Sequence, residues 1–447
     1  MSVVVMKFGG TSVKSKAART AAALRVVSAR EQGLKPVVVV SAIGRKGEPY
    51  ATDTLISFLR DIEPDVEPEP RELDLLMGCG EILSSVVFAH TLKALGHSAI
   101  SLRGGQAGIR TDGNYGNARI LGINPMGVQE ALHRDLIPVV CGFQGVWIQG
   151  GLPGAELTTL GRGGSDTTAA GLGAALQAER VEIYTDVDGV KTADPDFVPG
   201  APTLRQVTYS EVAEIAHLGA MVLHPRAAEI GMKFGIPLWV KNTFTDDPGT
   251  EVIEESRATG RKVTGVTHTG KLVAFSVDVT VLEEGDRAGF AATIFQIFSD
   301  HLVSLYMVSR GPDGFGFAVR REQYADVRAI LDALVIPASM GTVAVCQVGS
   351  AQSDSVRTQA RLMQRGSEPT MVPFQVVEGC TMVSVVGRDY MRQPGVFLNV
   401  MGLLVREQIQ VLQTSDSESS LSCLVPESEL RRAVAALHEG LGLAEAV

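Results

Sequence analysis

The chain has 447 residues, of which 45% are hydrophobic and 20% are charged, and its formal net charge at pH 7 is −10. This length exceeds what one hydrophobic core supports, so we expect two to four domains in a globular protein. The negative charge disfavours nucleic-acid-binding and membrane-surface proteins, so any anionic ligand must be held by a few locally placed Lys and Arg side chains.

The N-terminus starts directly on a strand pattern, and it lacks the composition of a signal or transit peptide. No apolar stretch is expected to reach the length of a membrane span, so the sequence favours a cytoplasmic protein. The five cysteines are scattered without C-x-x-C spacing. This pattern predicts buried thiols rather than a zinc site or a disulfide framework.

The first 248 residues alternate strand-like and helical segments. Strands are predicted at residues 3–5, 37–40, 138–141, 181–185 and 237–240, and helices at residues 16–31, 73–95 and 169–177. Such alternation is typical of a mainly parallel sheet covered by helices on both faces, and ligands bind at the carboxyl ends of its strands. The acidic, proline-rich segment 61–70 is predicted to be a solvated loop.

Two glycine-rich turns stand out in this region, one at residues 7–13 and the other at residues 161–166. Glycines let backbone N–H groups approach an anion, and a helix N-terminus after each turn adds positive potential. Lys7 and Arg162 add full charges. Neither turn has the spacing of a Walker A loop or of a G-x-G-x-x-G fingerprint. We predict that the two turns form one phosphate site. The alternatives are that Lys7 is an ordinary surface lysine, Arg162 a solvated loop arginine and Asp166 only a helix N-cap.

Further polar residues follow strands or interrupt apolar segments. Thr52 caps a helix or binds a ligand carboxylate, and Glu81, within an apolar helix, needs a buried arginine or a ligand ammonium as partner. Asp186 and Asp188 follow a strand and suit Mg²⁺ or nucleotide hydroxyls, although D-x-D-G is also an ordinary turn. His224, before a proline, is interpreted as structural.

Beyond about residue 265 the chain matches itself at a constant offset. Gly289 falls on Gly395, Ser309 on Ser415 and Leu331 on Leu437. Each copy is predicted to run glycine turn, helix, strand, polar turn, strand, helix, which is the order of a ferredoxin-like βαββαβ unit. The polar segment 350–368 is predicted to connect the copies.

Several segments together resemble aspartate kinases. They are KFGGTSV at 7–13, SAIGRKGEPYATDT at 41–54, GCGE at 78–81, GFQG at 142–145, LGRGGSDTTAA at 160–170, YTDVDGV at 184–190 and VLHP at 222–225. The repeated tail resembles the paired ACT domains of that family, and the second segment, with VLQTSDS at 411–417, is most similar to the single-chain Bacillus-type enzymes.

The resemblance implies an α/β fold: an amino-acid-kinase αβα sandwich with a mainly parallel sheet, then two ACT domains. The implied boundaries are a catalytic domain at 1–248, a linker at 249–264, ACT domains at 265–348 and 371–447, and a connector at 349–370. The implied reaction is phosphorylation of the L-aspartate β-carboxylate by ATP with Mg²⁺, which begins lysine, diaminopimelate, threonine and methionine biosynthesis. Such an acceptor needs no general base, because it is ionised near neutral pH.

The resemblance also implies residue roles. Lys7 and Asp166 would be catalytic, and aspartate would be bound by Ser41, Thr52, Glu81, Arg162 and Ser165. The nucleotide would meet Lys7, Phe8, Gly9, Gly10, Thr185, Asp186, Lys191, Asp196 and Met221. An amino-acid feedback effector would bind near Asp286, Ala291, Ser309 and Ser415, and no metal ligand is assigned. A homodimer through the ACT domains is expected.

Three positions depart from the family pattern. Lys191 stands where an aromatic residue is common, Asp196 where an arginine is common and Met221 where a lysine is common. Two lost phosphate contacts would cost about 1.5–3 kcal/mol each. These departures keep open an alternative, a regulatory relative that binds amino acids with weak or no kinase turnover. A relative acting on acetylglutamate, carbamate or UMP fits less well, because it lacks the paired tail.

Overall fold

The computed structural model describes residues 2–148, 155–255, 262–337, 343–348, 369–388 and 395–445. The chain divides into two compact units. Unit 1 comprises Met1–Thr192, Gly200–Thr264 and Ala444–Val447, and unit 2 comprises Ala193–Pro199 and Gly265–Leu443. The short segment Ala193–Pro199 therefore belongs with the C-terminal part of the chain.

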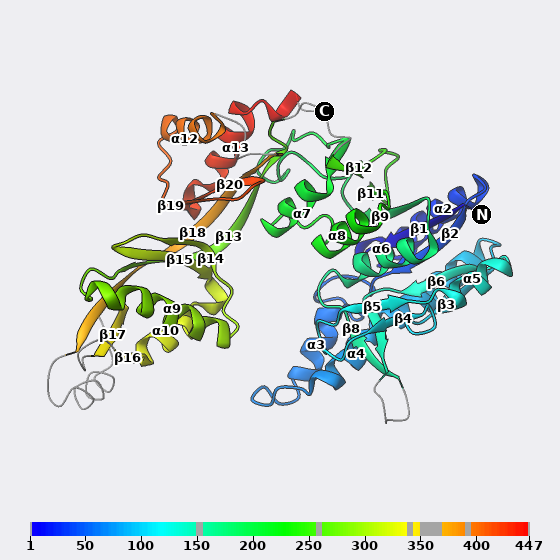
Figure 1. Ribbon diagram of the computed structural model, residues 1–447. Coiled ribbons are helices and arrows are strands. Elements are labelled where there is room, and N and C mark those ends of the chain that lie inside the picture. Colours follow the sequence, from blue (N-terminus) through cyan, green and yellow to red (C-terminus); the bar gives the residue numbers. More distant parts are fainter. Residues whose placement is uncertain are drawn as a thin grey trace. The chain divides into compact units, whose positions relative to one another are not determined.

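Unit 1 is built on an eight-stranded sheet with the strand order β10-β12-β11-β9-β1-β2-β6-β3 (Figure 1). Its strands are β1 (Val3–Phe8), β2 (Lys35–Val40), β3 (Ala99–Leu102), β6 (Ile137–Cys141), β9 (Arg180–Thr185), β10 (Gln206–Thr208), β11 (Leu238–Asn242) and β12 (Thr250–Ile253). Neighbouring strands run parallel except β11 and β12, which are antiparallel. The predicted mainly parallel sheet is confirmed.

Helices lie on both faces of this sheet. The helices of unit 1 are α1 (Gly10–Val13), α2 (Lys16–Glu31), α3 (Thr52–Arg60), α4 (Pro70–Ala94), α5 (Met126–His133), α6 (Gly164–Leu176), α7 (Tyr209–His217) and α8 (Pro225–Phe234). Val4, Met6 and Phe8 share a buried cluster with apolar residues of α2 and α4. Because successive side chains of a strand point to opposite faces, Lys7 points to the other face, where α6 packs on β1.

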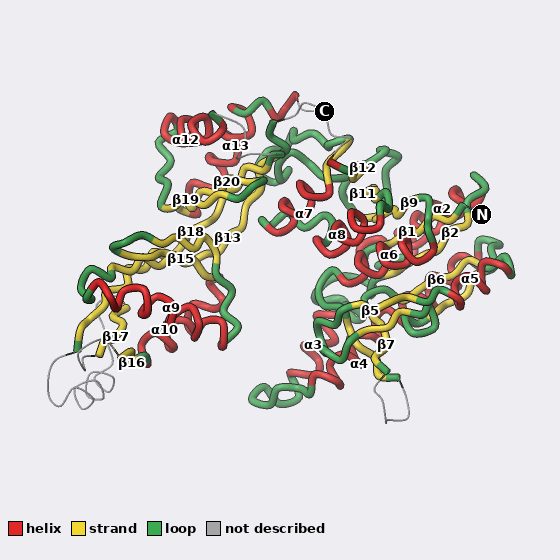
Figure 2. The backbone as a smooth tube through the Cα atoms, viewed as in Figure 1, coloured by secondary structure: helices red, strands yellow, loops and turns green. Residues whose placement is uncertain are grey.

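A smaller four-stranded sheet, not predicted from the sequence, has the order β5-β4-β7-β8. Its strands are β4 (Ile109–Thr111), β5 (Ile120–Ile123), β7 (Gln144–Trp147) and β8 (Glu156–Thr159), and Figure 2 shows them as yellow segments. β8 ends directly before the second glycine turn, and the turn at residues 113–117 lies between β4 and β5. This sheet therefore places two loops that matter for the site.

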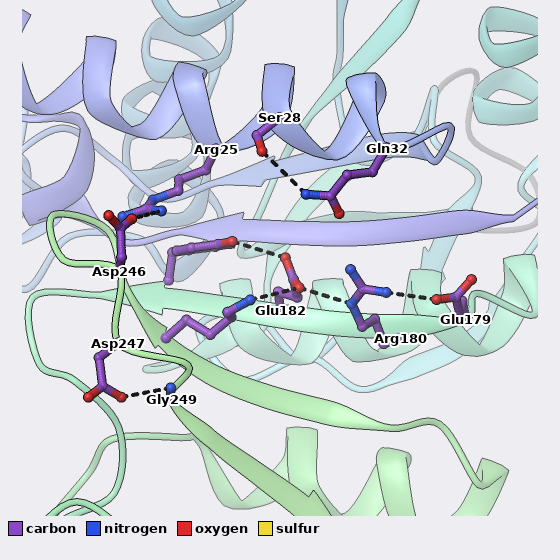
Figure 3. A network of polar contacts seen from close by, with 11 residues as sticks. Arg25, Ser28, Gln32, Glu179, Arg180, Glu182, Asp246, Asp247 and Gly249 are labelled. Atoms are coloured by element: carbon purple, nitrogen blue, oxygen red, sulfur yellow. Dashed lines mark hydrogen bonds and ion pairs between the residues drawn. The ribbon is translucent and has the colours of Figure 1, made fainter. Parts of the chain in front are cut away.

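A buried carboxylate crosslinks the central strands of unit 1. Glu182 on β9 accepts hydrogen bonds from Arg180 Nε at 2.9 Å, Lys241 Nζ at 3.2 Å and the Tyr184 hydroxyl at 3.0 Å (Figure 3). Burial raises the pKa of Glu182, but the charges and hydrogen bonds of Lys241 and Arg180 outweigh it and keep the pKa below its usual value. Arg25 of α2 reaches Asp246 at 2.7 Å, which ties that helix to the loop after β11.

Helix α4 corrects one expectation from the sequence. It is 25 residues long and apolar enough to cross a membrane by length and composition, so the expectation that no stretch reaches that length is wrong. One such helix is weak evidence of a span, because core helices pass the same test and half of its apolar window is buried. The prediction of buried thiols holds for Cys141, Cys346, Cys380 and Cys423, which are buried and form no disulfide with the described residues, but Cys79 on α4 is exposed.

Unit 2 contains twelve named helices and strands in its described residues, and short 3₁₀ turns lie at Arg321–Gln323 and Glu427–Glu429. A third 3₁₀ turn, Leu443–Glu445, begins at the last residue of unit 2. The helices and strands are β13 (Gly265–Asp278), α9 (Glu284–Asp300), β14 (Tyr306–Arg310), β15 (Gly314–Arg320), α10 (Tyr324–Ala333), β16 (Val335–Pro337), β17 (Val343–Val348), β18 (Thr370–Val386), α12 (Val396–Arg406), β19 (Gln413–Asp416), β20 (Ser420–Pro426) and α13 (Leu430–Gly440).

The two copies of the repeat share long strands. The C-terminal part of β13 pairs with β15 and with the start of β18, whereas residues 265–269 pair with the end of β18, which also pairs with β20. The predicted ACT boundaries remain a prediction, and most of the predicted connector lies outside the described residues. One detail of the repeat is wrong: Gly395 caps α12 with a φ of 91°, but Gly289 lies inside α9, which begins at Glu284.

Candidate active site

One cavity in unit 1 brings the two glycine turns together. It has a volume of about 580 Å³ and lies at the carboxyl ends of β1 and β2. Its lining includes all of the predicted catalytic and aspartate-binding residues: Lys7, Ser41, Thr52, Glu81, Arg162, Ser165 and Asp166. Gly10 and Gly161 line the same cavity. The prediction that two distant turns border one site is therefore confirmed, while the individual roles stay predictions.

Lys7 and Asp166 form an ion pair across the cavity floor, with 2.7 Å between Nζ and Oδ1. Helix α6 begins at Gly164, five residues before the predicted start, because Gly163 adopts a left-handed conformation and acts as the N-cap. Asp166 therefore lies in the first turn of α6 without capping it, and its carboxylate is free to face Lys7. The two side chains are only 13% and 10% exposed, so this pair orients the lysine ammonium.

His224 supports Asp166 and has a structural role, as predicted. Its backbone N–H donates to Asp166 Oδ2 at 3.2 Å, and its Nδ1 accepts from the Arg226 backbone N–H, which caps α8. Burial lowers the pKa of His224, which favours the neutral imidazole that this cap requires. The ring also lies against Gly163, where an added Cβ would sit 2.1 Å from His224 Cδ2. A glycine is thus required at Gly163.

Gly10 brings the first glycine turn against the loop after β2. A Cβ at this position would lie 2.4 Å from the Gly44 carbonyl oxygen and 2.9 Å from that of Ala42. The Gly44 backbone N–H donates to the Gly10 carbonyl at 3.1 Å, which closes the contact. α1 starts at Gly10 with Gly9 as its N-cap and has no side-chain cap. Its first backbone N–H groups are therefore available to an anion.

Glu81 is 2% exposed on α4, where Oε1 accepts from the Ala42 backbone N–H at 2.9 Å. Oε2 is buried and has no hydrogen-bond partner among the described residues. Burial raises the pKa of Glu81 to about 8, although the hydrogen bond from Ala42 opposes the shift. Of the two partners considered from the sequence, no buried arginine takes Oε2 in the described residues. The arrangement suits a ligand ammonium.

Arg162 sits at the tip of the second turn, between Gly161 and Gly163, whose φ angles are 76° and 75°. Its side chain is 80% exposed and lies 3.7 Å from Asp53 Oδ1. The guanidinium is therefore held loosely and is available to a ligand carboxylate. Thr52 is the first residue of α3 and does not cap it, since Ala51 is the N-cap and no side chain bonds there. Thr52 lines the cavity, and no cap hydrogen bond occupies its hydroxyl.

The predicted nucleotide residues at the end of β9 divide into two groups. Asp186 forms an ion pair with Arg45, at 2.8 Å, and the Thr185 hydroxyl donates to Asp186. Asp188 is engaged elsewhere: it accepts from Asn242 and Thr245, and these hydrogen bonds lower its pKa. Phe8 is fully buried and stacks on Phe88 and Tyr184, so it can offer a nucleotide only its backbone.

The three departures from the family pattern have different surroundings. Lys191 donates to the Ala201 carbonyl at 3.4 Å and to the Thr203 hydroxyl at 3.2 Å, and Met221 is 57% exposed. Asp196 belongs to the segment that packs within unit 2, where its carbonyl accepts from Arg431 at 2.9 Å. The roles of all three toward a nucleotide remain predictions.

Sequence reasoning missed two kinds of site residue. Arg45 and Lys46 line the cavity and add two cations to it, and their position just after the β2 strand and Gly44 was the available signal. Asp74, a fully buried carboxylate on α4 outside the cavity lining, was also missed, because its helix has an apolar sequence.

Two of the four predicted regulatory residues line cavities of unit 2. Ala291 lines the first, of about 510 Å³, together with Arg287, and Asp286 is the next residue toward the N-terminus of α9. Ser309 lines the second, of about 360 Å³, together with Gln413, whose Nε2 donates to Ser309 at 3.1 Å. Ser415 follows on the same strand, β19.

Comparisons with known proteins decide the family. Residues 2–242 match the amino acid kinase family, and residues 375–439 match an ACT domain. The chain is 36% identical to Aspartokinase 1 of Bacillus subtilis, over 98% of both chains, and 35% identical to the aspartokinase of Geobacillus stearothermophilus, over 100% of this chain and 98% of the other. The chain belongs to the aspartokinase family.

Solved structures share the aspartokinase fold. Aspartate kinase from Clostridium acetobutylicum superposes with a TM-score of 0.71 at 19% identity, covering 99% of this chain and 100% of that one. E. coli aspartokinase III in complex with aspartate and ADP gives 0.68 at 24% identity, covering 98% and 100%. The predicted family and fold class, an α/β sandwich followed by ACT modules, are confirmed.

Proposed function

We propose that this aspartokinase transfers the γ-phosphoryl group of ATP to the β-carboxylate of L-aspartate, giving 4-phospho-L-aspartate and ADP. The observation that carries the proposal is the single cavity in which the Lys7–Asp166 pair, the exposed Arg162 and the unpartnered oxygen of Glu81 meet. Its charges complement those of a zwitterionic amino acid with an extra carboxylate. The E. coli relative, which shares this fold, was solved with aspartate and ADP.

In this mechanism aspartate is held at both ends. Glu81 accepts the substrate ammonium, and the Arg162 guanidinium binds a carboxylate, with Thr52, Ser41 and Ser165 completing the pocket. The β-carboxylate is the nucleophile and needs no general base, because it is already ionised. The protein therefore contributes alignment and charge stabilisation.

Lys7 acts on the transferring phosphoryl group. Asp166 holds the Lys7 ammonium in place, so that its charge is preorganised where the negative charge of the transferring group is greatest. Gly9 and Gly10 border the phosphate oxygens, and the Gly10 N–H is the donor, because the Gly9 N–H already donates to the Tyr184 carbonyl at 3.2 Å. Thr185 with Asp186 meets the nucleotide at the end of β9. Phe8 contributes through its backbone, and we propose nucleotide contacts for Lys191, Asp196 and Met221 as well.

Mg²⁺ fits this site as an ion that arrives with the nucleotide. Among the described residues no group of three or more His, Cys, Asp or Glu side chains forms a metal site, whereas Asp186 offers one carboxylate near Thr185. Mg²⁺ is commonly held by one or two carboxylates together with substrate phosphates. Asp186 would hold the ion, which when bound neutralises phosphate charge.

We further propose that the chain begins the biosynthesis of lysine, diaminopimelate, threonine and methionine, and that the ACT modules bind an amino-acid end product. A lysine complex is known for E. coli aspartokinase III. The effector would bind near Asp286, Ala291, Ser309 and Ser415, in a cytoplasmic homodimer that pairs through its ACT modules. The boundaries given above, with the catalytic domain at 1–248 and ACT modules at 265–348 and 371–447, belong to this proposal.

A second candidate function is that of an amino-acid-binding regulatory relative with weak or no turnover. The substitutions at Asp196 and Met221 favour it, because each replaces a cation that the family commonly carries. Weak affinity for a non-hydrolysable ATP analogue together with normal aspartate binding would support this candidate.

Trapping with hydroxylamine tests the proposed function. The protein is incubated with Mg·ATP, aspartate and hydroxylamine, and the aspartyl hydroxamate is quantified against reactions that lack aspartate. We expect hydroxamate and ADP to form in equal amounts, only when aspartate is present. Folded protein that forms no hydroxamate would refute the kinase assignment.

A further inference from the structure

Asp74 is a fully buried carboxylate in the active-site unit, and the mechanism above does not use it. Its Oδ1 accepts from the Thr159 hydroxyl at 2.7 Å and its Oδ2 from the Thr159 backbone N–H at 2.7 Å. The Gly116 backbone N–H donates to both oxygens, at 2.9 and 3.0 Å. Burial raises the pKa of Asp74 above its usual value, although these hydrogen bonds oppose the shift. A buried carboxylate with this many donors is a strong structural anchor.

Both partners of Asp74 belong to segments that border the cavity. Gly116 lines it directly. Thr159 is the last residue of β8 and is followed by Leu160 and then by the Gly161–Arg162–Gly163 turn. Gly161 packs on the other segment, since a Cβ there would lie 3.0 Å from Asn117 Oδ1 and 3.2 Å from the Gly116 carbonyl.

A second clamp closes the same junction from α8. Arg226 donates to the Leu160 carbonyl at 3.0 Å through one guanidinium nitrogen and to Asn117 Oδ1 at 2.7 Å through another. The turn that carries Arg162 is therefore fixed by the strand before it and by the neighbouring segment 116–117. The Arg162 side chain itself has only the distant Asp53 as an ionic partner among the described residues. Its position depends on the backbone of its turn.

Asp74 also shares its helix with Glu81. The two residues are seven positions apart on α4, two helical turns, so both project from the same side of the helix. One rigid element thus bears the ammonium acceptor and the anchor of the carboxylate-binding turn. The distance between the groups that hold the two ends of the amino acid is set through α4.

We propose that Asp74 is a positioning residue for the amino-acid substrate: by binding Gly116 and Thr159 it fixes the Arg162 turn relative to Glu81. This proposal rests on the proposed function. Asp74 does not touch the substrate. It sets the geometry in which Arg162 meets a substrate carboxylate while Glu81 holds the ammonium.

The first test compares Asp74→Asn with a matched control, Glu211→Gln. Glu211 is also a buried carboxylate that accepts from a backbone N–H, that of Thr208, and from a threonine hydroxyl, that of Thr264, but it caps α7 away from the cavity lining. We expect Asp74→Asn to raise the KM for aspartate by about 10- to 100-fold, the cost of a misplaced positioning group. The KM for ATP should stay unchanged, and Glu211→Gln should change neither.

The second test follows the turn itself without using activity. Tyr115, within the segment that Asp74 holds, packs edge-on against Trp147 with 6.2 Å between ring centroids. The chain has two tryptophans. A Trp239→Phe background therefore leaves Trp147 as the single reporter. Asp74→Asn should shift its emission to longer wavelength, and Glu211→Gln should not.

The outcomes separate the alternatives. A selective rise in the aspartate KM together with the emission shift supports the proposal. If Asp74→Asn raises both KM values equally, or leaves both at the wild-type level, the proposal is wrong. If that variant does not fold, Thr159→Val decides, since it deletes only the hydroxyl donor and should give a smaller selective rise. A wild-type protein without hydroxamate formation would instead refute the proposed function, and the emission shift would still test the anchoring.

Discussion

Proton release on aspartate binding is the sharpest consequence of the environment of Glu81. Its pKa in the folded protein is about 8, against an ordinary value of 4.5. At pH 7 about nine-tenths of the unliganded protein therefore carries a proton on Glu81. The buried Oε2 has no partner among the described residues, which agrees with a protonated carboxyl. An ammonium placed against it favours the carboxylate, so binding must expel the proton.

Two quantities follow from this value. At pH 7 each aspartate bound should release about 0.9 proton, and at pH 9 the release should fall to about 0.1. Below pH 8 the affinity for aspartate should rise about tenfold per pH unit, and it should level off above pH 8. Glu81→Gln should abolish the release and weaken binding by about 10- to 150-fold, the worth of a charge-assisted hydrogen bond.

Titration calorimetry in buffers of different ionisation enthalpy measures the released protons directly. A non-hydrolysable ATP analogue is present throughout, so that no turnover occurs. Aspartate binding without proton release at pH 7, or an affinity that is flat between pH 6 and 8, would refute the placement of the ammonium at Glu81.

The same shift has a consequence for stability. Because the pKa is raised on folding, the folded protein binds more protons than the unfolded chain between pH 4.5 and 8. The contribution of Glu81 is therefore fully favourable below pH 4.5 and is lost as the pH rises through 8. In urea unfolding, the free energy of unfolding of Glu81→Gln should fall less between pH 4.5 and 8 than that of the wild type.

Three further predictions address the rest of the site. Lys7→Ala should lower kcat by about 10²–10³-fold, as expected for the loss of a preorganised charge, while circular dichroism shows a retained fold; an unchanged kcat would remove Lys7 from the mechanism. Gly10→Ala should displace the loop at residues 42–44 and abolish most activity, whereas Gly122→Ala, where an added Cβ has open space, should behave as the wild type; equal activities would contradict the close contact. Under native conditions a thiol reagent should modify Cys79 rapidly and the four buried cysteines only after unfolding, and rapid modification of several thiols would show that the core is not closed.

Much of unit 1 could be predicted because its signals are local. Glycine turns that follow apolar strands revealed Lys7 and Arg162, and the carboxyl-end rule placed them on one site. Glu81 was identified because a carboxylate is out of place in an apolar helix. These residues line one cavity, as expected.

Other features depend on contacts that are distant in sequence. The four-stranded sheet is made of strands of three or four residues, too short to give a periodic pattern. Asp74 has partners 42 and 85 positions away, so nothing near it in the sequence marks it as an anchor. In the sequence, Asp188 was as good a candidate for Mg²⁺ or nucleotide binding as Asp186, but in the structure its carboxylate accepts hydrogen bonds from Asn242 and Thr245. The pairing of β13 with β18 could not be foreseen, because its partners, from Val277 with Phe374 to Gly265 with Val386, are far apart in the sequence and leave no local pattern.

Oxygen transfer tests most directly whether a substrate carboxylate attacks ATP in this cavity. Aspartate labelled with oxygen-18 in its β-carboxylate is incubated with Mg·ATP and the protein, and the product is cleaved with hydroxylamine. The carboxylate oxygen that attacked phosphorus then leaves as part of the phosphate when hydroxylamine attacks the carbonyl carbon. Attack by the β-carboxylate predicts one labelled oxygen in each phosphate, and one such phosphate for each hydroxamate formed. Unlabelled phosphate, with ADP formed at the same rate, would contradict it.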